Sequence, residues 1–304
     1  MLPPLSGLVA APFTPFRANG DLALEAIPQL ATLLSRNGVQ GAFVCGTTGE
    51  GSSLTSDERR DVAAAWRQAA PPQLKLTVHV GHLSLRESQA LARHAQQIGA
   101  DAVATLAPNF FKPADIHALV AWCAQVAAAA PQLPFYYYHM PAMTGVDIPV
   151  REFLAVAPAE IPNFVGVKFT HEDLGDYADS YALAKKRYSL LFGRDEILLS
   201  GLQIGADGAV GSTYNYAAPL YHQLMAALAG GDLATARARQ AQAREFIDVM
   251  NRLGGLPAGK AIMKFIGVDC GPVRAPLSRI DEAREAELHR QLTAIGFFNY
   301  ASRV

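Results

Sequence analysis

Short apolar segments alternate along the chain with longer segments in which apolar residues recur every three or four positions. The short segments are apolar throughout, which is typical of parallel strands buried on both faces. They predict strands at 7–13, 41–46, 74–81, 102–108, 134–139, 164–170, 189–193 and 208–213. The longer segments predict helices at 22–37, 56–70, 84–98, 114–129, 149–156, 173–186 and 197–204, and an eighth that ends near residue 230. Thr-Ser-Asp-Glu at 55–58 is an N-cap signal for the second helix.

Eight strands that each lead into a helix predict a closed (β/α)8 barrel, the α/β fold called a TIM barrel. An open, doubly wound sheet is the alternative. Three further helices are predicted at 232–253, 259–267 and 281–294, with no Ser- or Pro-rich linker before them. We therefore expect residues 1–230 to form a barrel that carries the active site. Residues 231–304 are expected to form a C-terminal helical extension packed on that barrel.

Composition narrows the choice of partner and location. Half of the 304 residues are hydrophobic and the net charge is −1, so a folded core is expected and nothing attracts nucleic acid. No stretch reaches the roughly 20 apolar residues that span a bilayer, and the proline-rich N-terminus lacks the basic segment of a secretion signal. The three cysteines are far apart and match neither a disulfide framework nor a zinc site. We expect a cytoplasmic protein with no membrane partner.

The carboxyl ends of barrel strands are where active sites form, so residues at these ends are the candidates for chemistry. Lys168 is the only lysine inside an apolar strand near such an end. Burial disfavours the charged form of an amine, and a neutral amine can attack a ketone to form a Schiff base. The alternative is a structural lysine that pairs with Asp195 or Glu196.

Other strand ends offer weaker signals. Gly-Thr-Thr-Gly-Glu at 46–50 is a turn whose backbone N–H groups and hydroxyls could hold a carboxylate or phosphate, or it is an ordinary tight loop. Tyr138 could relay protons, whereas Tyr136 and Tyr137 are expected in the core. Asp195 and Glu196 form a carboxylate pair or cap a helix. No metal site is predicted, since His79 and His82 lack a third ligand.

Together these segments resemble the family of pyruvate-dependent class I aldolases that contains dihydrodipicolinate synthase and N-acetylneuraminate lyase. The resemblance extends from Ala-Pro-Phe-Thr-Pro-Phe at 11–16, through Gly-Arg-Asp-Glu at 193–196, to Val-Arg-Ala-Pro-Leu at 273–277. It implies a barrel with a helical extension, usually a homotetramer, that needs no cofactor. It also implies that Lys168 is the Schiff-base lysine, that Tyr138 is the proton-relay phenol, and that the Thr47-Thr48-Gly49 turn holds the keto-acid carboxylate, with Thr47 assisting the relay.

The choice of activity within the family depends on the residues that hold the part of the substrate beyond the keto acid. Met143 stands where the synthases have an arginine for a second carboxylate, and a methionine cannot neutralise one, so synthase activity is not expected. The segment 138–145, where Met143 precedes Thr-Gly, resembles the sialic-acid lyase pattern, and Tyr-Tyr-Tyr-His at 136–139 resembles the animal-type lyases in particular. The resemblance then implies reversible cleavage of N-acetylneuraminate to pyruvate and N-acetylmannosamine. The positions implied to hold the sugar are Thr170, Gly193, Asp195, Glu196 and Ser212.

One position departs from the family pattern. Many members have a tyrosine two residues after the proline that corresponds to Pro108, contributed to the relay across a subunit interface, and Phe110 stands there in this chain. A phenyl ring cannot pass a proton, so either Thr47 and water suffice or the relay is altered. An aldolase for another 2-keto-3-deoxy sugar acid, and a non-catalytic relative that binds a keto acid, remain as alternatives.

Overall fold

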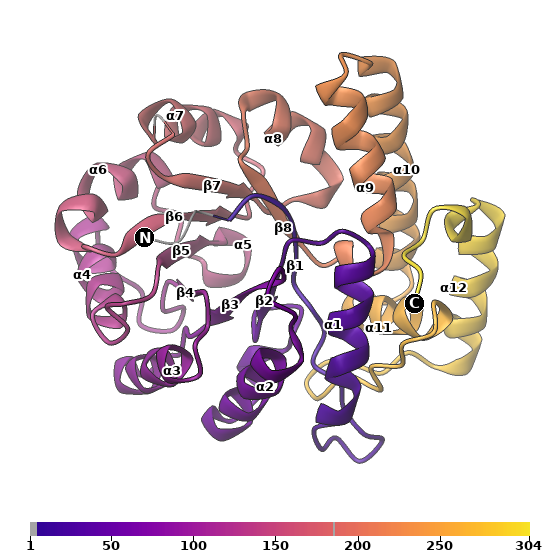
Figure 1. The fold of residues 1–304 in the computed structure, drawn as a ribbon, viewed down its shortest axis with the longest axis horizontal. Helices are drawn as coiled ribbons and strands as arrows, with labels where there is room; N and C mark the ends of the chain where they lie inside the picture. Colours follow the sequence, from indigo (N-terminus) through magenta and orange to yellow (C-terminus); the bar gives the residue numbers. More distant parts are fainter. Residues whose placement is uncertain (1–4, 185) are drawn as a thin grey trace.

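The eight short apolar segments form a closed barrel of parallel strands in the order β1 to β8 (Figure 1). A computed structural model describes residues 5–184 and 186–304. The strands are β1 Gly7–Ala10, β2 Gly41–Val44, β3 Lys75–His79, β4 Ala102–Leu106, β5 Phe135–His139, β6 Phe164–Phe169, β7 Ser189–Phe192 and β8 Gly208–Gly211. β8 pairs in parallel with β1, which closes the barrel and excludes the open sheet. The predicted (β/α)8 fold is confirmed.

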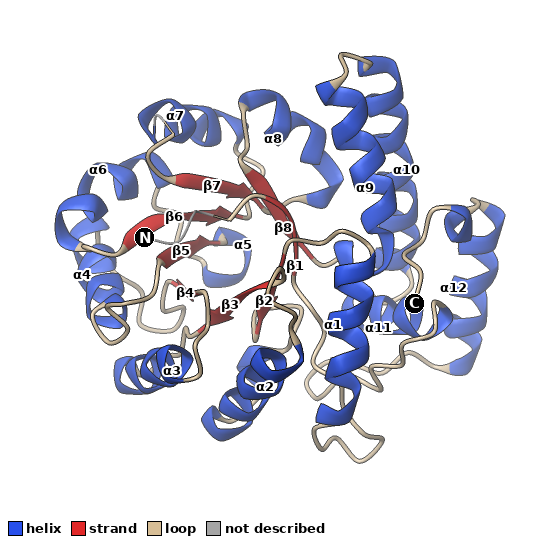
Figure 2. Ribbon diagram, viewed as in Figure 1, coloured by secondary structure: helices blue, strands red, loops and turns tan. Residues whose placement is uncertain are grey.

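Helices follow the strands and surround the barrel, as Figure 2 shows. They are α1 Ile27–Arg36, α2 Ser56–Ala69, α3 Leu85–Gln97, α4 Ile116–Ala127, α5 Pro141–Thr144, α6 Val150–Glu160, α7 Leu174–Ala184, α8 Leu198–Ile204, α9 Tyr214–Ala229, α10 Leu233–Arg252, α11 Leu256–Phe265 and α12 Glu282–Ala294. Short 3-10 helices are η1 Leu24–Ala26, η2 Gly51–Ser53, η3 Asp195–Ile197 and η4 Phe297–Asn299. The N-cap predicted for α2 is a complete capping box between Thr55 and Glu58.

Several predicted boundaries were wrong. Most strands end one to three residues early, because the backbone leaves the hydrogen-bonded ladder while its side chains stay buried; β2 ends before Cys45, whose φ is 58°. The helix predicted at 22–37 divides into η1 and α1, and the short helix α5 was not predicted. α6 continues through Pro158 in its last turn, since the Ile161 N–H still bonds to the Ala157 carbonyl at 2.8 Å. Residue 185, inside the helix predicted at 173–186, lies outside the described residues.

Two apolar layers hold the barrel. A large layer packs between the strands and the surrounding helices, and a smaller one fills the barrel interior with Val9, Phe43, Tyr136, Tyr138 and their neighbours. Tyr136 accepts a hydrogen bond from the Leu5 N–H at 2.9 Å, so this phenol is satisfied inside the core. Side chains alternate along a strand, so Tyr138 points to the interior with Tyr136, while Tyr137 stacks on Phe153 outside.

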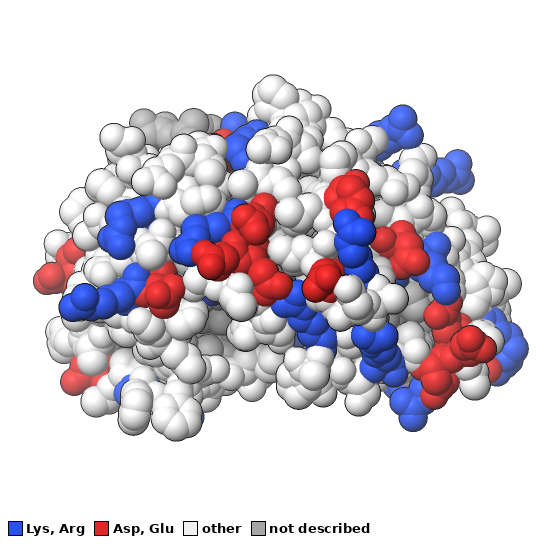
Figure 3. Space-filling view, turned by 90° about the horizontal axis from the view of Figure 1, so that it is seen from below, with Lys and Arg blue, Asp and Glu red and all other residues white. Residues whose placement is uncertain are grey.

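The C-terminal helices pack on one side of the barrel, where α10 lies along α9 and against η3 (Figure 1). On the face drawn in Figure 3, acidic and basic side chains are intermingled, as the net charge of −1 leads one to expect. No helix in the described part of the chain is long and apolar enough to cross a lipid bilayer.

Candidate active site

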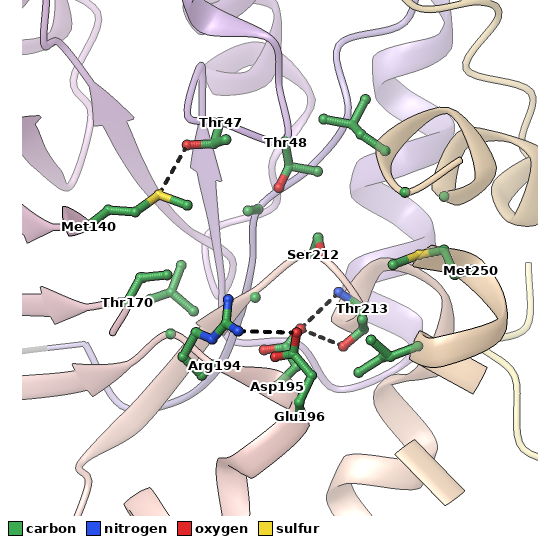
Figure 4. Close-up of a pocket in the computed structure, with 18 of the residues that line it drawn as sticks. Thr47, Thr48, Met140, Thr170, Arg194, Asp195, Glu196, Ser212, Thr213 and Met250 are labelled. Carbon is green, nitrogen blue, oxygen red and sulfur yellow. Dashed lines mark hydrogen bonds and ion pairs between the residues drawn. The ribbon is translucent and has the colours of Figure 1, made fainter. Parts of the chain in front are cut away.

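A cavity of about 230 Å³ opens at the carboxyl ends of the strands, and the C-terminal helices close one of its sides (Figure 4). The ends of β1, β2, β5, β6, β7 and β8 supply its walls together with α10 and α11. The residues predicted from the sequence that line it are Thr47, Thr48, Tyr138, Lys168, Thr170, Gly193, Asp195, Glu196 and Ser212. Gly49 lies behind this wall, where its α-carbon faces the backbone of Pro12 and Cys45. Six strand ends therefore bring together residues that span most of the chain.

Lys168 lies near the end of β6, paired in register with Tyr138 of β5 and Leu191 of β7. Its side chain is only 4% exposed. The amine lies 3.9 Å from the centre of the Tyr138 ring and 4.3 Å from that of Phe43. Among the described residues it makes no ion pair with a carboxylate, so pairing with Asp195 or Glu196, the structural alternative, does not occur. The amine is free to react at the cavity wall.

A phenol and a hydroxyl lie beside this amine. The Tyr138 hydroxyl is 3.3 Å from Thr47 Oγ1 and donates to Met140 Sδ at 2.9 Å. A thioether is a weak acceptor, so a substrate oxygen can replace it as the partner of the phenol. This pair can therefore move a proton at the position where a ligand meets Lys168.

The turn after β2 is compact because its glycines admit close backbone contacts. A Cβ on Gly51 would lie 2.0 Å from the Cys45 carbonyl oxygen, so only glycine fits there. The Gly51 N–H bonds to the Gly46 carbonyl and the Glu50 N–H to the Thr47 carbonyl, both at 3.0 Å. The Thr47 and Thr48 side chains then face the cavity (Figure 4).

Asp195 forms the opposite end of the cavity. Its carboxylate is 5% exposed and accepts from the Thr213 hydroxyl at 2.6 Å and from the Thr213 N–H at 3.2 Å. Burial raises the pKa of this carboxyl to about 6, and the bond from the Thr213 hydroxyl opposes that shift. Its side chain caps no helix, since Arg194 occupies the N-cap of η3. Asp195 is therefore a buried acceptor that faces the cavity.

Arg194 is a lining residue that the sequence did not single out. Its guanidinium pairs with Glu172 at 2.5 Å. It also reaches Glu196 at 3.7 Å, as Figure 4 shows. It thereby joins the loop after β6 to the loop after β7 and limits where the Glu196 carboxylate can lie. Its position beside Asp195 and Glu196 in the sequence was the only signal, and that signal does not show which way a side chain points.

Small residues leave room beside two further oxygens. A Cβ on Gly193 would lie 2.0 Å from Thr170 Oγ1, and one on Gly211 would lie 2.0 Å from Asp195 Oδ1. Both oxygens are buried and have no hydrogen-bond partner in the part of the chain that the structure describes. Thr170 and Asp195 also line the cavity, so both side chains are candidates for hydrogen bonds to a hydroxyl-bearing ligand.

His79 lies behind the site. Its Nδ1 is 3.1 Å from the Cys45 carbonyl oxygen, which only accepts, so Nδ1 carries the proton. Burial, reinforced by the charges of Arg59 and Lys168, holds the pKa of His79 well below 6.5, so this imidazole is neutral. Burial raises the pKa of the Cys45 thiol to about 11, as for a packing cysteine. Within residues 5–184 and 186–304, no three His, Cys, Asp or Glu side chains are grouped to hold a metal ion.

Comparison with known proteins gives consistent matches over nearly the whole chain. The model of the dihydrodipicolinate synthetase family matches residues 4–295. The N-acetylneuraminate lyase of Rattus norvegicus is 44% identical over 301 residues, which are 97% of this chain and 94% of that protein. The structure of Proteus mirabilis N-acetylneuraminate lyase is 40% identical, with a TM-score of 0.94 over 96% of this chain and 99% of that one. The Aliivibrio salmonicida enzyme, titled a sialic acid aldolase, is 38% identical with a TM-score of 0.94 and covers 96% and 97%.

Proposed function

The chain belongs to the dihydrodipicolinate synthetase family, and on this premise we propose that it is a class I aldolase that cleaves N-acetylneuraminate reversibly to pyruvate and N-acetylmannosamine. Identity of about 44% to an N-acetylneuraminate lyase over 97% of the chain supports this substrate. The observation that carries the chemistry is the buried Lys168 amine, which makes no ion pair with a described carboxylate and opens onto the cavity beside Tyr138.

The first step joins substrate and enzyme. The Lys168 amine adds to the C2 ketone of the open-chain sugar acid, and loss of water gives a protonated imine. The substrate carboxylate lies at the turn after β2, where Thr47 and Thr48 supply hydroxyls and backbone N–H groups. No metal or organic cofactor is needed, because the iminium group supplies the electrophile.

Cleavage then breaks the C3–C4 bond. Its electron pair moves into the iminium group and leaves an enamine on Lys168, while the C4 hydroxyl loses its proton and becomes the aldehyde. Tyr138, which gives its own proton to the departing water in the first step, takes that proton, or it orients the substrate carboxylate that takes it. The enamine is protonated at C3, and hydrolysis releases pyruvate and restores the amine. The 3.3 Å contact with Thr47 supports a relay that does not require a phenol at Phe110.

The sugar end needs several convergent polar groups. Thr170, Asp195, Glu196 and Ser212 line this end of the cavity, and we assign them to the hydroxyls of the sugar, with Gly193 giving the space for that contact. Met143, at the position of the arginine of the synthases, is 59% exposed and carries no charge for a second carboxylate. Another 2-keto-3-deoxy sugar acid is the second candidate, because the same lysine chemistry accepts any aldehyde that this end admits.

The organisation of the protein is proposed on the same basis. We propose a catalytic barrel over residues 1–230 and a helical extension over 231–304, and a homotetramer as in the resemblance. Exposed apolar side chains support a subunit contact: Phe110, Phe111 and Met143 are 75%, 86% and 59% exposed after β4 and β5. Light scattering should then give four times the 32.5 kDa of one chain. Free, buried cysteines accord with a cytoplasmic location.

Pyruvate release from N-acetylneuraminate tests the proposal. Wild type should release pyruvate, Lys168→Ala should not, and Lys112→Ala, which changes an exposed lysine outside the cavity, should match wild type. Borohydride reduction in the presence of pyruvate should trap an adduct on Lys168 alone. Trapping without release from N-acetylneuraminate would reject this substrate in favour of another keto-deoxy acid. No trapping at all would reject the aldolase.

A further inference from the structure

Two buried polar side chains reach the site from behind, and both come from the C-terminal helices: Gln240 of α10 and Lys260 of α11. Neither lines the cavity. We propose that each is a positioning residue for one end of the substrate, Gln240 for the sugar and Lys260 for the keto acid. The proposal rests on the aldolase function proposed above and adds to it a role for the C-terminal helices.

Gln240 holds the turn that carries the acceptors for the sugar. Its Nε2 donates to the carbonyl oxygens of Asp195 and Glu196, each at 3.0 Å. Its Oε1 accepts from the Leu199 N–H at 2.8 Å, in the first turn of α8. Both amide protons and the carbonyl oxygen are therefore used on a single turn, η3 and the start of α8. The two carboxylates project from this turn towards the cavity (Figure 4).

Lys260 holds the turn after β2 in a similar way. Its ammonium lies 2.8 Å from Glu50 Oε1 and donates to the carbonyl oxygens of Thr14 and Pro272 at 2.9 and 2.8 Å. The Lys260 and Glu50 side chains are 3% and 1% exposed. Glu50 has a φ of 52° and closes the turn that begins at Thr47. Thr14 also fixes this turn directly, because its hydroxyl donates to the Gly49 carbonyl at 2.6 Å.

The two contact sets share no residue, so their effects should separate. A shift of η3 moves the Asp195 and Glu196 carboxylates and leaves the turn after β2 in place. Loss of the Lys260 contacts moves that turn and leaves the two carboxylates in place. A general loss of stability would instead weaken both ends together. A variant that changes the constant for only one substrate, N-acetylmannosamine or pyruvate, therefore indicates a positioning role and not a merely structural one.

The test uses the synthetic direction, in which pyruvate and N-acetylmannosamine are varied independently. Gln240→Met keeps the side-chain length and removes the three hydrogen bonds, and Gln240→Asn is a milder second variant. Gln242→Met, on the same helix but away from the site, is the matched control. For Lys260 the double variant Lys260→Gln/Glu50→Gln avoids leaving a buried charge unpaired, and Lys264→Gln is its control on the exposed side of α11.

We expect Gln240→Met to raise KM for N-acetylmannosamine about tenfold, which is the cost of losing one hydrogen bond between the sugar and a carboxylate. The pyruvate concentration that gives half-maximal trapping by borohydride should not change. The Lys260/Glu50 double variant should raise pyruvate half-saturation by about the same factor and leave KM for the sugar unchanged. Both controls should match wild type in both constants.

Equal changes of both constants in either variant, or changes only in melting temperature, would overturn the proposal. Wild type that traps pyruvate but does not use N-acetylmannosamine would reject the proposed substrate alone. The pyruvate arm still tests Lys260 in that case, and the aldehyde that the enzyme does accept tests Gln240. Wild type that traps no pyruvate would reject the proposed function and this inference with it.

Discussion

Asp195→Asn should make the protein more stable at neutral pH and a poorer enzyme. The Asp195 carboxylate is buried, accepts hydrogen bonds only from Thr213 among the described residues, and has one oxygen without a partner. Burial raises its pKa from 3.8 to about 6. Asparagine has nearly the same shape and can accept the Thr213 bonds through its carbonyl oxygen, but it carries no charge to bury.

The direction and the magnitude of this stability change follow from the difference in proton binding between the folded protein and the unfolded chain. Between pH 3.8 and about 6 the folded protein keeps the Asp195 proton while the unfolded chain has lost it, so this group's contribution to stability falls as the pH rises through that window. Above the window the cost is constant. A pKa raised from 3.8 to about 6 corresponds to about 3 kcal/mol, because each tenfold change in proton affinity is worth about 1.36 kcal/mol. Asp195→Asn should recover up to about 3 kcal/mol at pH 8 and little of it at pH 4.

Denaturant unfolding of wild type and Asp195→Asn at pH 4 and pH 8 measures this difference, and other titrating groups cancel between the two proteins. The kcat/KM for N-acetylneuraminate should fall about 10- to 100-fold, since hydrogen bonds to a charged acceptor are lost. Thr213→Val should change the stability in the opposite direction. It removes the donor that favours the ionised form of Asp195, so it should destabilise the protein more at pH 8 than at pH 4. A variant Asp195→Asn that is no more stable than wild type at pH 8, or a gain that is independent of pH, would refute the reasoning.

Three further variants test separate parts of the site. Tyr138→Phe should lower kcat by about 100-fold or more, the usual contribution of general acid–base catalysis, with an unchanged melting temperature; an unchanged kcat would remove the phenol from the relay. Gly211→Ala places a methyl group 2.0 Å from Asp195 Oδ1 and should cost about 1–3 kcal/mol in thermal unfolding and raise KM for the sugar. Arg194→Ala releases Glu196 from a partly exposed ion pair worth at most about 1 kcal/mol, so KM for the sugar should rise no more than about fivefold in steady-state kinetics.

Most of the barrel could be predicted because its strands are buried on both faces, and such burial leaves continuous apolar segments in the sequence. The same property explains the errors at strand ends, since apolarity reports burial and does not report backbone pairing. β1 was predicted to reach residue 13 and ends at Ala10, yet Phe13 remains buried against Tyr216. α6 was predicted to end at residue 156 but reaches Glu160, because Pro158 removes only the bond that its own N–H would donate, and the Ile161 N–H still bonds to the Ala157 carbonyl at 2.8 Å.

The site was predictable where a residue type conflicts with its surroundings. Lys168 stands out as a charged residue within an apolar strand, and the family resemblance added the roles that we propose for Tyr138 and the turn after β2. Lys260 gave no such signal, because a lysine in a helix is usually solvated, whereas α11 is buried on most of its surface. Gln240 contacts Asp195 across 45 positions of sequence. Contacts at that separation depend on how helices pack, which periodicity does not reveal.

The two ends of the cavity are built on different physical principles. At the end that we propose for the keto acid, Lys260 and Glu50 form a buried ion pair at 2.8 Å behind the turn after β2. At the end that we propose for the sugar, Thr170 Oγ1 and Asp195 Oδ1 are buried without a partner among the described residues. An unpaired buried polar group costs about 1–3 kcal/mol, and a ligand hydroxyl removes that cost on binding. Such a site rejects an analogue that lacks the hydroxyl more strongly than an apolar pocket rejects an added one. On the function proposed above, we therefore infer that selectivity for a polyhydroxylated aldehyde arises from the unpaired buried groups at one end of the cavity, and reactivity from the turn and the lysine at the other.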